Sequence, residues 1–149
     1  MREERNIAPL LLGALLIASL LLDWSALVFP IDIFRFPVNI LSMALWLAVT
    51  IELYRKREKW AMSRFMLSGS ATTLSLVAMV GLGIVFGIQL RPATTSYTVI
   101  IATLFLMSHL LLVTLRGWRN VRGIRWRFVV NHLGLLIAIG AAFWGAPDR

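Results

Sequence analysis

The chain has 149 residues, of which 59% are hydrophobic and only 15% charged. This composition excludes a water-soluble domain, because the interior of a domain of this size is too small to bury so much apolar surface. The net charge of +8 does not indicate nucleic-acid binding, because the basic residues lie in short clusters between apolar segments. The chain has no cysteine, which excludes disulfides, thiolate metal sites and thiol catalysis.

Five long apolar segments predict an all-α, polytopic membrane helix bundle of about five transmembrane helices in a single domain, residues 1–149. Each segment is close to the length of about 20 residues that spans the hydrocarbon of a bilayer as a helix. No small-residue cleavage site follows the first segment, so we expect a retained helix and no removed signal peptide. The predicted spans are residues 7–29, 37–54, 65–88, 97–115 and 128–146.

The basic residues predict the orientation of these spans. Of the 15 lysines and arginines, 12 lie before the first span, between the second and third, or between the fourth and fifth. The positive-inside rule therefore predicts a multi-pass protein with its N-terminus cytoplasmic and its C-terminus on the outer side, which is periplasmic where the membrane is the bacterial inner membrane. Most tryptophan and tyrosine residues lie near the predicted interfaces, which agrees with this topology, and only Trp46 lies in the middle of a span.

Two histidines, His109 and His132, lie in the fourth and fifth predicted spans. His109 precedes Arg116 by seven residues, about 10 Å along a helix, and His132 follows Arg127 by five residues, about 8 Å. Because the two spans are antiparallel and share the inner loop, we expect both imidazoles at a similar depth in the cytoplasmic half. Imidazole is an axial ligand of haem iron, and guanidinium groups match the geometry of the propionates. These residues therefore predict a site for haem b, with His109 and His132 as iron ligands and Arg116 and Arg127 near the carboxylates.

Other interpretations of the same residues stay open. Each histidine could hydrogen-bond within the bundle, and because packed helix axes are about 8–10 Å apart, a porphyrin between neighbours would be crowded and one histidine could bind alone. The arginines of residues 116–127 could anchor the topology by contacting anionic lipid. Asp23 and Glu52 lie toward helix ends, which favours interfacial carboxylates over proton-coupled transport. Small residues at intervals of four in the last span predict close helix packing: Gly134, Ala138 and Ala142.

The last span carries a resemblance to a known family. Residues 127–135 read Arg-Phe-Val-Val-Asn-His-Leu-Gly-Leu and continue to Gly-Ala-Pro-Asp at residues 145–148. This stretch resembles the helix before the periplasmic domain in the ResB (CcsB) family of system II cytochrome c biogenesis, above all its Bacteroidetes-type members. Shorter stretches at residues 36–40, 83–87 and 112–116 also resemble that family.

The resemblance implies a haem-handling protein that partners a CcsA-like protein and moves or holds haem across the inner membrane. The histidine that matches His132 would ligate haem entering from the cytoplasmic side, whereas His109 matches no motif of the family. This sequence departs from the family because it ends at Arg149, where members continue into a large periplasmic domain. It also has no tryptophan-rich WWD motif, which belongs to the CcsA-like partner. We therefore do not expect it to be a complete cytochrome c synthase.

Three hypotheses for function follow. The first is a haem-binding assembly or delivery protein with His132 as its main ligand. The second is an electron-transfer or quinone-reactive subunit that holds a b-type haem between His109 and His132. The third is a structural subunit of a larger membrane complex, without a cofactor. The sequence carries none of the common soluble-enzyme motifs, so enzymatic activity of the chain alone stays undecided.

Overall fold

The structure is a computed structural model that describes residues 2–25, 33, 35–88, 96–120 and 123–144, and these residues form six helices and no strand. The helices are α1 (Arg2–Trp24), α2 (Val38–Arg55), α3 (Ala61–Met66), α4 (Gly69–Ile88), α5 (Tyr97–Trp118) and α6 (Trp126–Trp144). Helices α1, α2, α5 and α6 are long and apolar enough to cross a membrane, and α4 contains a shorter apolar stretch, Gly69–Gly81. The predicted all-α bundle is confirmed, with four to five helices that could span a bilayer.

The helix bounds follow the predicted spans closely at most ends. Helix α2 is displaced by one residue from the prediction, α5 continues three residues further, and α6 begins two residues earlier. The predicted third span differs, because the chain bends after Met66 and separates the short α3 from α4. Residues 26–29 of the first predicted span and 145–146 of the last lie outside the described residues.

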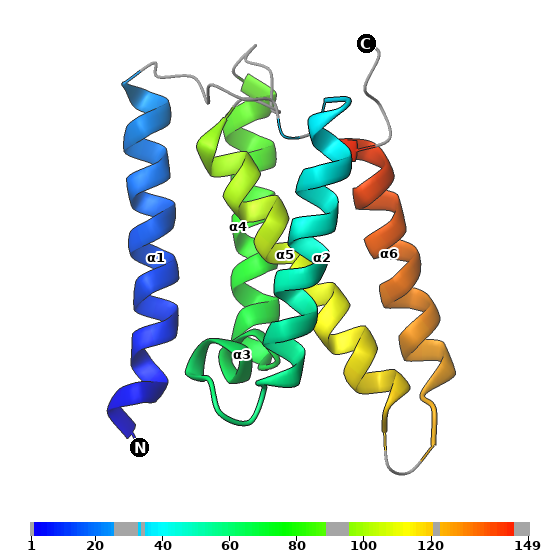
Figure 1. Cartoon of the computed structure of the whole chain (residues 1–149). Coiled ribbons are helices and arrows are strands. Elements are labelled where there is room, and N and C mark those ends of the chain that lie inside the picture. Colours follow the sequence, from blue (N-terminus) through cyan, green and yellow to red (C-terminus); the bar gives the residue numbers. More distant parts are fainter. Residues whose placement is uncertain (1, 26–32, 34, 89–95, 121–122, 145–149) are drawn as a thin grey trace.

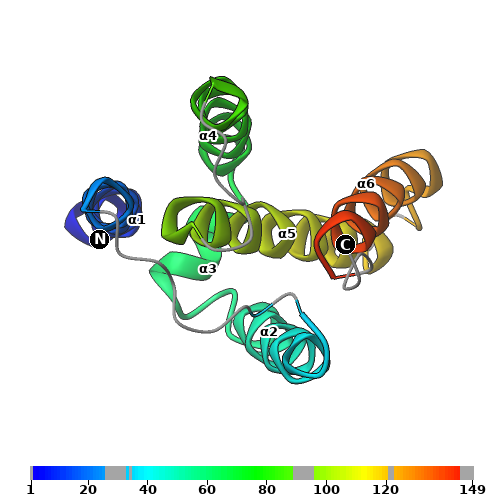
Figure 2. The ribbon, with the colours of Figure 1, turned by 90° about the horizontal axis from the view of Figure 1, so that it is seen from above.

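Helix α5 is the central element of the bundle. It crosses the bundle on a steep diagonal in Figure 1, and α1, α2, α4 and α6 surround it when viewed from above in Figure 2. In the 18-residue apolar window of α5, 78% of the residues are buried, against 11% in the corresponding windows of α2 and α6. In a bilayer, lipid tails are as apolar as the side chains, so nothing drives the outer faces of the surrounding helices inward. The exposed apolar side chains of these helices suit contact with lipid. The central helix is therefore the scaffold on which any internal site is built.

Hydrogen bonds between helices fix the outer helices on this scaffold. Trp46, the one mid-span tryptophan, donates from Nε1 to the hydroxyl of Ser108 at 2.8 Å, which joins α2 to α5. Trp144 of α6 donates from Nε1 to the hydroxyl of Ser42 on α2 at 3.0 Å, and the Trp46 and Trp144 rings lie 5.7 Å apart. A polar group that would otherwise be unsatisfied in hydrocarbon gains a partner in each case.

The basic segments of the chain lie at one end of the bundle. The start of α1, the α2–α3 connection and the end of α5 all lie at the lower end in Figure 1. The end of α1 and the end of α6 lie at the opposite end. The arrangement of the helices thus brings together the three basic clusters that the positive-inside argument places on one side of a membrane.

Candidate functional site

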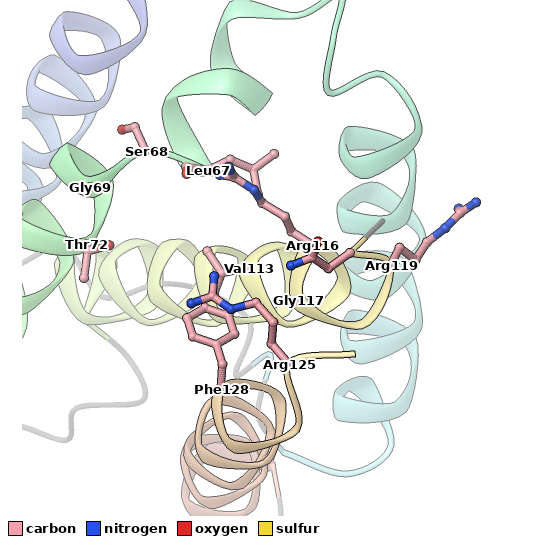
Figure 3. Close-up of a pocket in the computed structure, with 11 residues that line it drawn as sticks. Leu67, Ser68, Gly69, Thr72, Val113, Arg116, Gly117, Arg119, Arg125 and Phe128 are labelled. Carbon is pink, nitrogen blue, oxygen red and sulfur yellow. Dashed lines mark hydrogen bonds between the residues drawn. The ribbon is translucent and has the colours of Figure 1, made fainter. Parts of the chain in front are cut away.

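A half-open pocket lies at the basic end of the bundle, between the α3–α4 bend, the end of α5 and the start of α6 (Figure 3). Its volume is about 520 Å³. Arginines, small polar groups and apolar side chains all contribute to its wall. The lining residues are Leu67, Ser68, Gly69, Thr72, Val113, Arg116, Gly117, Arg119, Asn120, Arg125 and Phe128.

Three arginines line this pocket: Arg116, Arg119 and Arg125. Of these, the sequence singled out only Arg116 as a candidate haem-binding residue. Arg116 extends toward the bend and donates to the carbonyl oxygen of Leu67 at 3.3 Å. The guanidinium of Arg125 lies over the ring of Phe128, with Cζ 5.2 Å from the ring centroid, whereas Arg119 points away from both (Figure 3). Arg127 is exposed on the first turn of α6 and does not line the pocket. Arg125, which the sequence did not single out, lines it instead.

His109 is buried in α5 and has a hydrogen-bond partner for each ring nitrogen. Its Nδ1 lies 2.6 Å from the carbonyl oxygen of Met66, and its Nε2 lies 3.1 Å from the hydroxyl of Thr72. A carbonyl only accepts, so Nδ1 carries the proton, and Nε2 of the neutral ring accepts from the threonine hydroxyl. Met66 is the last residue of α3, where backbone carbonyls have no partner within the helix. His109 therefore fastens the α3–α4 bend to the central helix.

His132 has one ring nitrogen engaged and one without a hydrogen-bond partner among the described residues. Its Nδ1 donates to the carbonyl oxygen of Phe128, one turn earlier on α6, at 2.8 Å. The phenyl ring covers one face of the imidazole, with the ring centroids 3.9 Å apart. Arg125, Phe128 and His132 therefore form a stack that leads from the pocket into the membrane-spanning part of α6.

The two imidazoles differ in their surroundings. His109 and His132 lie on neighbouring helices, as the sequence indicated, but they bind to different elements and neither lines the pocket. Ligation of a metal by His109 would break its bond to Met66 or its bond to Thr72. Ligation by His132 through Nε2 would break none of the hydrogen bonds that the structure gives it.

Asp23 has a role that sequence reasoning missed. From the end of α1 it accepts hydrogen bonds from the Ser96 hydroxyl at 2.6 Å and from the main-chain N–H groups of Tyr97 and Thr98 at 2.8 and 3.0 Å. It thus caps the first turn of α5, whose free N–H groups favour a negative charge. A carboxylate at a helix end was the only signal in the sequence, and the partner lies more than 70 residues away.

The described residues contain no group of three or more His, Asp or Glu side chains placed to hold a metal ion. Haem needs only one or two protein ligands, so this finding leaves the haem prediction as a prediction. Comparison of the chain with models of protein families, with curated proteins and with solved structures finds no match.

Proposed function

We propose that this chain is a haem-handling protein of the bacterial cytoplasmic membrane, with its N-terminus and basic end in the cytoplasm and with His132 as the axial ligand. The observation that carries the proposal is the imidazole of His132, which has its Nδ1 proton on a backbone carbonyl and its Nε2 without a partner among the described residues. A metal-binding histidine commonly shows this arrangement, because the bond at one nitrogen fixes the tautomer and the ring orientation.

The residues present fit haem bound by one histidine. Phe128 covers a face of the His132 ring, but an iron ligand uses the lone pair in the plane of the ring, which the stacking leaves accessible. Arg116 and Arg125 line the pocket beside this stack and suit carboxylates, which guanidinium groups bind in pairs of hydrogen bonds. When bound, haem would be the cargo that is passed intact toward a CcsA-like partner, and these residues would hold and orient it.

The residues do not fit haem held between two histidines. Both nitrogens of His109 already have partners, and its side chain is 3% exposed. We therefore favour delivery or holding of haem, with a CcsA-like protein as the partner, over a permanent electron-transfer haem with two histidine ligands.

The test is the optical spectrum of the full chain purified in mild detergent from haem-replete cells, with a pyridine haemochrome assay. We expect a Soret band that is lost in His132→Ala and retained, per folded molecule, in His109→Gln. Loss of the band in both variants at equal folded yield would instead support the electron-transfer site with two ligands. A wild-type protein that binds no haem under these conditions would reject the proposal.

A second candidate, a structural subunit without a cofactor, is favoured by the outer face of α6. Gly134, Ala138 and Ala142, which the sequence predicts to pack against a helix, are exposed in this chain, as is the polar Asn131 on the same helix. Small residues and an amide at this depth suit contact with another transmembrane helix. This candidate predicts copurification with larger membrane proteins that survives substitution of His132, whereas delivery of haem would not survive it.

A further inference from the structure

The pocket at the basic end lies at the level where phospholipid headgroups are found. Trp118 at the end of α5 and Trp126 at the start of α6 are next to lining residues of the pocket, Arg119 and Arg125. Their rings meet edge to face at 5.6 Å, and the two residues are 50% and 58% exposed. Indole rings of membrane proteins concentrate at the interface between hydrocarbon and water, which places the pocket opening at that interface.

The arginines of the pocket have no acidic partner among the residues that the structure describes. None of the lining residues is acidic, and residues 59–147 contain no Asp or Glu. Glu52 and Glu58 form ion pairs with neighbouring basic side chains at the end of α2 and in the α2–α3 connection, away from the pocket. Arg116, Arg119 and Arg125 therefore repel one another unless an anion lies between or beside them.

The chemistry of the pocket suits a phosphate with an apolar attachment. Arg116 uses one N–H on the Leu67 carbonyl, and Arg125 has no side-chain hydrogen bond within the described residues, so both keep donors for an oxyanion. Leu67, Val113 and Phe128 supply an apolar wall next to these donors. Inorganic phosphate would gain nothing from that wall, whereas the glycerol and first methylene groups of a lipid would be shielded by it.

An apolar track continues from the pocket along α4. Thr72 lines the pocket, and Leu76 and Val80 follow it at intervals of four residues, so all three share one face of the helix. Leu76 is 59% exposed and Val80 is 64% exposed. Helix α4 rises from the basic end of the bundle (Figure 1), so the residues that follow Thr72 lead away from the pocket, in the direction in which an acyl chain would extend from a headgroup held there.

We propose that the pocket binds the phosphate of an anionic phospholipid, with Arg116 and Arg125 as its ligands and an acyl chain along the Thr72, Leu76 and Val80 face of α4. The lipid site does not depend on haem, since it uses neither histidine. In protein that carries no haem, the lipid phosphate would be the ligand of the two arginines. The bound lipid would also hold the α3–α4 bend against the inner leaflet.

The test uses the full chain, expressed without added haem, in nanodiscs of phosphatidylcholine with a minor fraction of phosphatidylglycerol. Native mass spectrometry counts the phosphatidylglycerol retained when the protein is released into detergent. We expect selective retention by the wild type and a loss of roughly fivefold in each of Arg116→Gln and Arg125→Gln, because each cation near the membrane surface attracts anionic lipid by a comparable amount. Arg125→Gln removes no hydrogen bond of the described structure, so it reports on binding even if Arg116→Gln unfolds.

Lys59→Gln is the matched control, because Lys59 is an exposed cation at the same end of the bundle and outside the pocket. Equal retention in Arg125→Gln and Lys59→Gln would overturn the site and leave only a general attraction of the basic surface for anionic lipid. Glycerol phosphate is then added in excess to the wild type and to Arg125→Gln. If it displaces the lipid from both proteins at the same concentration, the role of the acyl chain is overturned. His132→Ala should retain the lipid, so the outcome is separate from that of the haem experiment.

Discussion

His109 and Arg116 lie seven residues apart on α5 and bind the carbonyl groups of the two consecutive residues at which α3 ends. His109 donates to Met66 at 2.6 Å, and Arg116 donates to Leu67 at 3.3 Å. Positions seven apart share one face of a helix, so the central helix presents both donors to the bend. These two donors thus satisfy carbonyl groups that a helix end leaves free.

Substitution of His109 is expected to loosen this bend. His109→Ala removes two buried hydrogen bonds, and we expect the free energy of unfolding to fall by about 2 kcal/mol. Thr72→Val removes one of the two bonds with little change in volume and should cost about 1 kcal/mol. Reversible unfolding in mixed micelles measures both. A His109→Ala variant as stable as the wild type would show that the imidazole does not hold the bend.

The apolar segments of the sequence predict the long helices well for a physical reason. A chain in hydrocarbon must satisfy its own backbone groups, so length and apolarity are enough to place a helix such as α2 or α5. Length and apolarity alone do not place the break after Met66, although the Ser-Gly-Ser run at residues 68–70 that follows it is a turn signal. The groups that stabilise the break come from α5, more than 40 residues away.

In the candidate site, too, the sequence predicts the placement of residues along the helices but not their contacts with distant parts of the chain. The rise per residue predicts that His109 and His132 lie on neighbouring helices in the basic half, but it does not predict what each ring binds. The partner of His132 is local, four residues before it, whereas those of His109 lie on α3 and α4. Arg125, which directly precedes α6, lines the pocket with its guanidinium over Phe128, whereas Arg127 is exposed outside it, and the sequence does not predict which arginine turns inward.

Asp23 is expected to stabilise the start of α5 from the end of α1. Asp23→Ala leaves a hydroxyl and two main-chain N–H groups without their acceptor, and we expect the free energy of unfolding to fall by about 1 to 2 kcal/mol. Asp23→Asn keeps one acceptor oxygen and should have a smaller effect. Ser25→Ala, which removes an exposed hydroxyl bonded to Leu22 within the same region, is the control. Thermal unfolding would contradict the capping role if Asp23→Ala and Ser25→Ala had equal midpoints.

The proposed orientation can be tested directly because the chain has no cysteine. Lys59 and Ser25 are exposed at opposite ends of the bundle, so single variants Lys59→Cys and Ser25→Cys report the two sides. With the basic end in the cytoplasm, a membrane-impermeant maleimide should label Ser25→Cys from the periplasm and should label Lys59→Cys only after the inner membrane is opened. The reverse result would invert the proposed topology and would place the arginine pocket on the other side of the membrane.

Gly117 allows α5 and α6 to approach closely beside the pocket. A methyl group built at this position would lie 2.8 Å from Cδ1 of Phe128 and 3.2 Å from Cγ2 of Val129, so Gly117→Ala must displace the phenyl ring that covers His132. We expect a loss of about 1 to 3 kcal/mol in unfolding free energy and, in a haem-loaded protein, a shifted Soret band. Gly134→Ala is the matched control, because nothing lies within 4 Å of its added methyl group and a helical alanine should be neutral or slightly stabilising. Equal stability of the two variants would mean that the helices do not meet at Gly117 as closely as the structure places them.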